Sequence, residues 1–166
     1  MFSTEEQGDL EALEDSLAEG AAHLAAATCR RLVSLAEFDR RQGWASSGAK
    51  SARHWLSWRC GVDPSSAAEM LRVAGRLREL PRVTEAFSRG EFTYSQVRLL
   101  VRVATPETEE DRCRIARYTT CAQLARVVGG FRRVLNGRGG PAPRAPPPVV
   151  LLRPRGVLRH PRTALP

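Results

Sequence analysis

The fold is decided by residues 61–100, which read GVDPSSAAEMLRVAGRLRELPRVTEAFSRGEFTYSQVRLL. Asp63-Pro64 is the pairing of an N-cap with a proline at the first helical position, and Thr93 with Gln96 forms a capping box. Leu80-Pro81 ends the first of these helices, because proline cannot continue one. Apolar residues recur at helical spacing between these signals: Ala67, Met70, Leu71, Ala74 and Leu77. The stretch therefore predicts short helices separated by tight turns.

The same signals extend on both sides of this stretch. An amphipathic helix is predicted from Thr4 to about Arg41, and a second helix ends at Gly61, a residue suited to the left-handed C-cap. Thr105-Pro106-Glu107 predicts the start of another helix, and Thr120 with Gln123 caps a last one. No strand-like alternation occurs before residue 134. We predict an all-α fold of about six helices in a compact bundle, with short connections.

The long first helix carries an apolar stripe whose partner the sequence leaves open. Its members recur every three or four residues: Leu10, Leu13, Leu17, Leu24, Leu32, Leu35 and Phe38. The mean step is close to the 3.5 residues of a coiled coil, so the stripe could be the seam of a homodimer. Packing of the stripe on its own domain is the interpretation we favour.

Charge and proline divide the chain into three parts. Residues 1–20 carry seven acids and no base, residues 21–133 have a net charge of +9, and residues 134–166 carry six arginines and no acid. The last part also holds eight of the eleven prolines, so we predict a disordered tail. The expected units are 1–23, the acidic start of the long helix; 24–133, the helical domain; and 134–166, the tail.

Several classes of function find no support in the sequence. There is no signal peptide and no apolar run of membrane-spanning length, so we expect a cytoplasmic protein without membrane contact. The four cysteines form no Cys-x-x-Cys pair and are expected as reduced thiols in or beside the core. The sequence lacks a phosphate loop, a paired-carboxylate motif and a metal-ligand spacing. We therefore expect no enzyme activity, no cofactor, no metal site and no small-molecule substrate.

DNA is the partner for which the sequence offers candidate residues. Two helix pairs resemble helix-turn-helix motifs: residues 51–60 followed by the helix from Pro64, and residues 83–88 followed by the helix from Tyr94. The candidate phosphate contacts are arginines on these elements: Arg53, Arg59, Arg72, Arg76, Arg98 and Arg102. Ordinary helix packing is the alternative, with Glu69, Glu79 and Glu91 neutralising the arginines locally.

An ordered series of signatures resembles a known family. The series runs Phe38-Asp39-Arg40-Arg41-x-Gly43-Trp44, Gly48-Ala49-x-Ser51, Trp55-Leu56, Gly61-Val62, Ala67-x-x-Met70-x-x-Val73-Ala74, Leu77-x-x-Leu80-Pro81 and Ala86-x-x-x-Gly90-Glu91-Phe92-Thr93. It is similar to the 13E12 repeat family of high-GC Gram-positive bacteria, whose N-terminal region is domain of unknown function 222. The later Val103-Ala104-Thr105-Pro106 and Thr120-x-x-Gln123-Leu124 fit as well, so the resemblance covers residues 24–133.

This resemblance implies an association with DNA, because many members carry an HNH endonuclease module after this region. Nothing after residue 133 supplies the histidines and asparagine of that module, so no catalytic residue is transferred from it. Our hypothesis is a non-catalytic, DNA-associated domain in a truncated or frameshifted member, with an out-of-frame tail. The alternatives are a protein-interaction or dimerisation module that uses the N-terminal helix, and a remnant without selected function.

Overall fold

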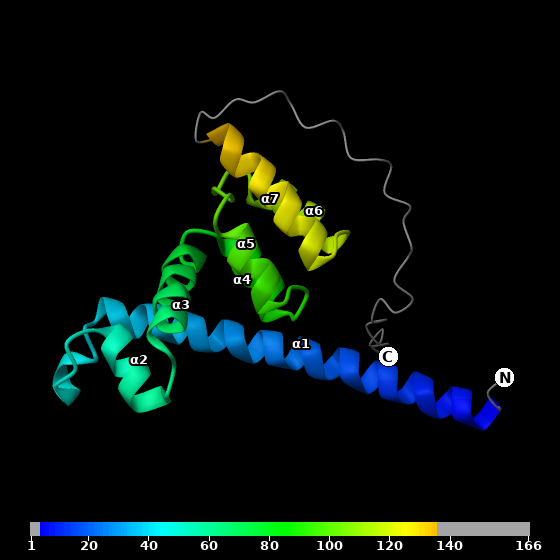
Figure 1. Cartoon of the computed structure of the whole chain (residues 1–166), viewed down its shortest axis with the longest axis horizontal. Helices are drawn as coiled ribbons and strands as arrows, with labels where there is room; N and C mark the ends of the chain where they lie inside the picture. Colours follow the sequence, from blue (N-terminus) through cyan, green and yellow to red (C-terminus); the bar gives the residue numbers. More distant parts are fainter. Residues whose placement is uncertain (1–3, 136–166) are drawn as a thin grey trace, which may run out of the picture.

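The structure is a computed structural model that describes residues 4–135, and Figure 1 shows the order of its elements. These residues form seven α-helices and one short 3-10 helix (η1), with no strand among them: α1 (Thr4–Arg40), η1 (Ala45–Ser47), α2 (Ala52–Cys60), α3 (Pro64–Leu77), α4 (Pro81–Ser88), α5 (Tyr94–Leu100), α6 (Glu109–Arg117) and α7 (Cys121–Leu135). The predicted all-α class is confirmed. The expected tail lies outside the described residues.

The C-terminal half of α1 supports the rest of the bundle. Helices α3, α4 and α5 pack against it, α2 packs on α3, and α6 and α7 cover α4 and α5 (Figure 1). The largest fully buried side chains come from four of these helices and from the turns before α4 and α5: Phe87, Phe92, Leu32, Leu80, Leu100 and Leu124. Their burial joins the helices into one core.

The N-terminal half of α1 extends beyond the bundle (Figure 1). The first buried residue of the helix is Ala25, whereas Leu10, Leu13 and Leu17 are exposed. The expectation that the apolar stripe packs on its own domain therefore holds only for its C-terminal members: Leu32 and Leu35 are buried, and Phe38 is half-buried against Trp55. The stripe has an exposed part and a packed part because the other helices contact α1 only from Ala22 onward, where α1 touches the turn at Gly90.

Most helix ends follow the local signals of the sequence. The Asp63 carboxylate accepts hydrogen bonds from Ser65 N and Ser66 N at 3.0 Å each, ahead of Pro64. Thr93 and Gln96 form the complete capping box of α5. These caps satisfy N–H groups that a helix leaves without an internal partner.

Two predicted boundaries differ from the structure. Helix α4 begins at Pro81 rather than in the segment from Val83. Helix α6 begins at Glu109, not at Thr105, because residues 105–108 form a turn in which Thr105 N donates to Thr108 Oγ1 at 3.0 Å. Thr108 thus occupies the N-cap position that the sequence assigned to Thr105, but its hydroxyl accepts from Thr105 N within the turn and does not cap α6.

A buried carboxylate explains why α4 begins without a capping residue of its own. Leu80 occupies the N-cap position and makes no side-chain cap. Glu109, only 3% exposed, instead accepts hydrogen bonds from Arg82 N at 2.9 Å and Val83 N at 3.2 Å. The first residue of α6 therefore caps α4 across the bundle.

The four cysteines are free and fall into two classes. Cys29 and Cys113 are buried, whereas Cys60 and Cys121 are exposed. Burial raises the pKa of both inner thiols, that of Cys113 to about 11. The expectation of reduced thiols in or beside the core fits the first pair, and the second pair lies on the surface.

The contact between Gly90 and α1 gives a first prediction. Gly90 has φ 76°, and a Cβ there would lie 2.6 Å from Ala22 O. We expect Gly90→Ala to destabilise the protein by more than about 2 kcal/mol, because backbone strain and a clash with α1 add together. Gly61→Ala is the matched control, since Gly61 has φ 65° but open space at its Cβ. Equal losses for the two variants in urea unfolding would contradict the role of the α1 contact.

The Glu109 cap gives a second prediction. Glu109→Ala leaves two backbone N–H groups at the start of α4 without an acceptor, so we expect a loss of about 1–3 kcal/mol of unfolding free energy. Glu109→Gln keeps one acceptor oxygen and should lose less. Glu110→Ala removes the exposed neighbour that pairs with Arg82, and its effect should stay below about 1 kcal/mol. A loss at Glu110 as large as that at Glu109 would refute the capping role.

Candidate nucleic-acid interface

The six candidate arginines lie on three helices and one adjoining turn. Arg53 and Arg59 belong to α2, Arg72 and Arg76 to α3, and Arg98 to α5; Arg102 follows the end of α5. Both expected helix-turn-helix pairs are present as α2–α3 and α4–α5, and the two helices of each pair pack on one another. The structure separates the arginines into a cluster on α3 and α5 and a pair on α2.

Three of the arginines share one carboxylate. Glu69 on α3 accepts hydrogen bonds from Arg72 at 2.8 Å through each of its two oxygens, so this pair is bidentate. The same carboxylate accepts from Arg98 at 3.2 Å and from Arg102 at 3.1 Å. Its side chain is only 21% exposed. We call Glu69, Arg72, Arg98 and Arg102 the Glu69 cluster.

Backbone contacts also join α3 to the end of α5. Arg76 donates to Val101 O at 3.3 Å and to Ala104 O at 2.7 Å, and it pairs with Glu79 on its own helix. Arg72 reaches Arg98 O at 3.4 Å. Arg76 therefore satisfies carbonyls where α5 ends, and it is the candidate arginine that the structure commits most fully to internal contacts.

A groove opens beside the Glu69 cluster. Its volume is about 360 Å³, and its walls combine hydroxyls, one aromatic ring and two guanidinium groups: Ser65, Ser66, Met70, Tyr94, Arg98 and Arg102, with Glu69 at the base. Arg98 lies 5.9 Å from the centre of the Tyr94 ring, within cation–π range. Desolvation raises the pKa of the Tyr94 hydroxyl, so Tyr94 stays neutral near pH 7.

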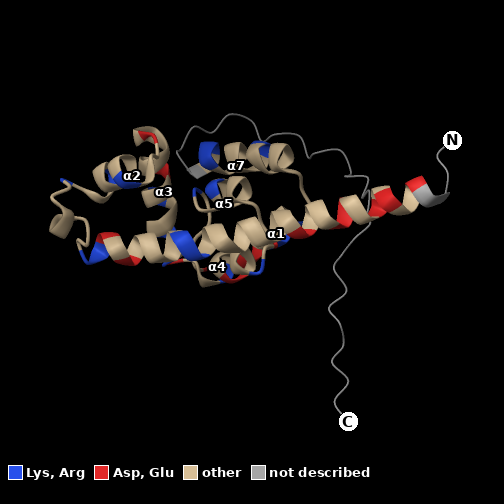
Figure 2. Ribbon diagram, turned by 90° about the horizontal axis from the view of Figure 1, so that it is seen from below, with Lys and Arg blue, Asp and Glu red and all other residues tan. Residues whose placement is uncertain are grey.

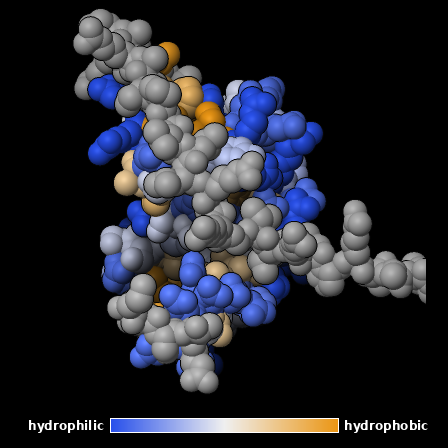
Figure 3. All heavy atoms as spheres, turned by 90° about the vertical axis from the view of Figure 1, so that its right-hand side faces the viewer, coloured by the Kyte–Doolittle hydropathy of each residue, from blue (hydrophilic) through white to orange (hydrophobic). Residues whose placement is uncertain are grey.

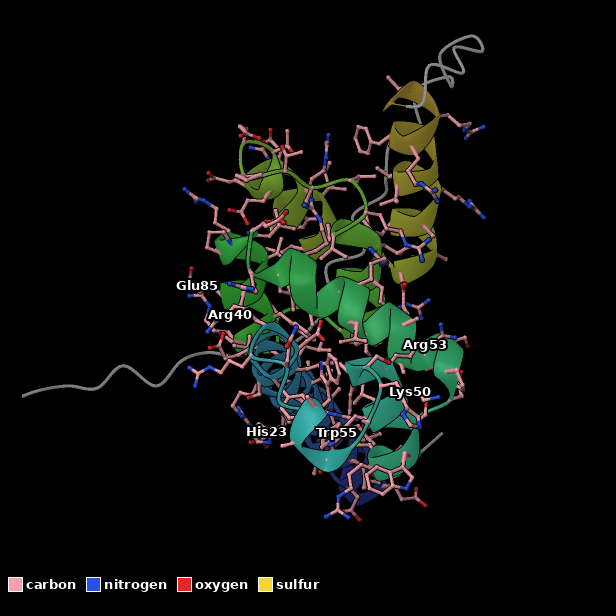
Figure 4. The ribbon with its side chains drawn as sticks, turned by 90° about the vertical axis from the view of Figure 1, so that its left-hand side faces the viewer. His23, Arg40, Lys50, Arg53, Trp55 and Glu85 are labelled. Carbon is pink, nitrogen blue, oxygen red and sulfur yellow. The ribbon has the colours of Figure 1, made fainter. Side chains whose placement is uncertain are left out.

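The two arginines of α2 lie apart from this cluster. Arg53 donates to Pro64 O at 2.9 Å and so holds the start of α3, and Figure 4 labels it close to Lys50. Arg59 is exposed in the last turn of α2 and has no ion-pair partner among residues 4–135. Neither contacts Glu69, so neither belongs to the Glu69 cluster.

Sequence reasoning missed a second basic element. Helix α7 contains three exposed arginines, Arg126, Arg132 and Arg133, and no acidic residue. Arg112 of α6 stacks on Phe131 of α7, with its guanidinium 3.7 Å from the ring centre. The absence of acids from this helix was the signal that could have identified it.

Other kinds of site find less support within the described part of the chain. No three His, Cys, Asp or Glu side chains of residues 4–135 lie together as metal ligands would. His54 accepts a hydrogen bond from Lys50 N, and His23 lies on the exposed part of α1 near Glu19. None of the helices in this range combines the length and apolar character needed to cross a membrane.

The Glu69 cluster makes a prediction about pH. Hydrogen bonds from Arg72, followed by those from Arg102 and Arg98, lower the pKa of Glu69 from 4.5 to about 2. A lowered pKa means that the stabilisation is complete above pH 4.5 and is lost as the pH falls toward 2. The urea midpoint of wild type should therefore be higher than that of Glu69→Gln at pH 6. The difference between the two midpoints should become smaller as the pH falls from 4.5 to 2. A difference that does not change over this interval would contradict the assignment.

Comparison with known proteins assigns the chain to a family. No curated protein and no solved structure matches the chain. The family model described as "Domain of unknown function (DUF222)" matches residues 10–140, which include α2 to α7 and most of α1. This match covers more than half of the 166 residues and extends beyond both ends of the stretch 24–133 that carries the sequence signatures. The chain therefore belongs to the DUF222 family.

Proposed function

We propose that this chain is a non-catalytic helical domain that associates with DNA, in a protein related to the HNH endonucleases of the 13E12 repeat family. The observation that carries the proposal is the Glu69 cluster, in which two helices direct three guanidinium groups toward one carboxylate beside an open groove. The relation to HNH proteins comes from the sequence signatures. Phosphodiester cleavage would then belong to an HNH module and not to residues 4–135.

The charge balance of the cluster fits a polyanion. Three guanidinium groups against one carboxylate leave two positive charges in excess in the Glu69 cluster, and two of these three groups line the groove. Arginine binds phosphate oxygens through paired N–H groups, and each phosphate contact releases counterions. Glu69 holds the side chains of Arg98 and Arg102 in place before DNA arrives, which lowers the entropy lost on binding.

Substitutions of opposite sign in the cluster test this proposal. Anisotropy of a labelled DNA duplex, titrated with the full chain over a range of NaCl concentrations, gives the affinity and its salt slope. Arg98→Gln with Arg102→Gln should weaken binding and reduce the slope by about two contacts, roughly 1.8 in log–log units. Glu69→Gln should strengthen binding at low salt, because it removes the negative charge that neutralises the arginines while its amide oxygen can still accept hydrogen bonds from Arg98 and Arg102. Asp111 and Arg114 form an exposed ion pair on α6, so Asp111→Asn is a control of equal charge change for Glu69→Gln, and Arg114→Gln is a single-charge control for the arginine substitutions.

The arginines of residues 134–166 are a separate source of DNA affinity and require their own control. Replacing all six by glutamine leaves only the helical domain to bind: Arg138, Arg144, Arg153, Arg155, Arg159 and Arg162. We expect this variant to retain salt-dependent binding that is sensitive to Arg98→Gln and Arg102→Gln. Binding that disappears with the six arginines, or that responds equally to the α6 controls, would reject the proposal.

A further inference from the structure

The exposed half of α1 carries leucines that the described part of the chain does not cover. The four leucines are between 51 and 75% exposed: Leu10, Leu13, Leu17 and Leu24. Seen from the end where α1 protrudes, apolar side chains reach the surface between hydrophilic ones (Figure 3). A helical segment of this length is marginal in water by itself, and a row of exposed leucines is typical of a binding face. This half of α1 therefore lacks the partner that its sequence pattern requires.

An apolar groove lies at the other end of the same helix. Its volume is about 350 Å³, and Leu35 and Phe38 of α1 form one wall while Trp55 and Leu56 of α2 form the other. The Phe38 and Trp55 rings pack with centroids 4.6 Å apart. Leu35 and Phe38 continue the spacing of the exposed leucines, so the leucine row and the groove occupy one side of α1.

The spacing along this side of α1 is symmetric about Leu24. The positions are 10, 13, 17, 20, 24, 28, 31, 35 and 38, whose steps of three and four read the same in both directions. A second α1 placed antiparallel about Leu24 therefore brings unlike positions of the two copies together: Leu10 with Phe38, Leu13 with Leu35, Leu17 with Arg31, and Gly20 with Thr28. The small residue Gly20 permits close approach of the two backbones near the centre.

Charge selects the same orientation. The N-terminal half of α1 is acidic, whereas the arginines of the helix lie toward its C-terminal end (Figure 2). A parallel pair would place seven acids of residues 1–20 beside the same seven acids of the second copy. An antiparallel pair instead places Arg30 and Arg31 opposite residues 14–19 of the second copy, which include three acids. Both arginines lack an ion-pair partner among residues 4–135, so they are available for these contacts.

We propose that the exposed face of α1 binds a second copy of this chain in the antiparallel orientation. The leucines of each protruding half then cover the Leu35–Phe38–Trp55 groove of the other copy, so each groove is completed by its partner. The inference is independent of the proposed association with DNA, since none of its residues belongs to the Glu69 cluster.

The first experiment measures the mass of the full chain in solution by sedimentation equilibrium. Wild type should be a dimer at about 10 µM, and Leu13→Glu with Leu17→Glu should raise the dissociation constant by more than roughly a hundredfold, since four leucines leave the interface. Val33→Glu is the matched control, because Val33 is 47% exposed on α1 but lies outside the leucine row. The substituted positions are exposed in one copy, so the variants should keep the helical content of wild type.

A second experiment tests the orientation by disulfide formation, with Cys60 and Cys121 first replaced by serine because they are exposed. Leu17→Cys combined with Arg31→Cys should give a covalent dimer, because these positions face each other only in the antiparallel pair. Leu17→Cys alone should not crosslink in an antiparallel pair. In a parallel pair, position 17 of one copy would lie beside position 17 of the other, and Leu17→Cys alone would form the disulfide. The two positions are about 21 Å apart along one helix, too far to bond within a copy.

Three results would overturn the inference: a wild type that stays monomeric at about 100 µM, a dimer that survives Leu13→Glu with Leu17→Glu, or crosslinking by Leu17→Cys alone. The basic residues 134–166 are the other occupant that charge would allow for the acidic half of α1. If the dimer is lost when the six arginines of residues 134–166 are replaced by glutamine, that segment, and not a second α1, would be the occupant of the exposed face of α1. A dimer that persists in that variant supports the pairing of the two α1 helices.

Discussion

The bundle depends on the contact between the C-terminal half of α1 and helices α3, α4 and α5. These helices are short, and none could bury its apolar face without the long surface that α1 offers. The turn at Gly90 approaches Ala22 of α1 so closely that the position leaves no room for a side chain. From that point to its C-terminus α1 contributes to the core, whereas residues 6–21 are exposed with respect to the rest of the described chain.

Two glutamates then fix how the outer helices sit on this base. Glu109 joins α6 to the start of α4, and Glu69 joins α3 to α5 through the arginines that surround it. Both accept hydrogen bonds from residues at least 26 positions away. A carboxylate with little exposure is tolerated only when its oxygens are satisfied, so each glutamate requires the packing that surrounds it. The arginine-rich surface is consequently less positive than the number of its arginines implies.

The helices could be predicted from the sequence because their signals are local. Asp63 and Thr93 cap residues two or three positions away, and Gly61 adopts the left-handed conformation that its place after a helix indicates. The start of α6 was misplaced because Thr105 and Thr108 lie within one turn and each precedes acidic residues, while Thr108, the N-cap in the structure, makes no side-chain cap that would distinguish it. Local spacing could not choose between them.

The candidate site could be predicted only as a set of residue types. Local spacing predicts that Glu69 pairs with Arg72, three residues further on, but nothing near Arg98 in sequence indicates that it shares the same carboxylate. The role of Arg76 at the end of α5 and the separation of Arg53 from the cluster likewise arise from tertiary packing. Membership of the DUF222 family follows from the family model that matches residues 10–140, and the ordered signatures predicted it because they combine many positions.

The distribution of the cysteines has a consequence for following the folding of this protein. Cys29 lies in the part of α1 that joins the core and Cys113 lies in α6, and the raised pKa values leave little thiolate at either site near neutral pH. Alkylation of these two thiols therefore requires the surrounding helices to separate, while Cys60 and Cys121 react from the surface. The protein thus contains, without any labelling, one chemical reporter for the opening of its first helix and another for the opening of its sixth.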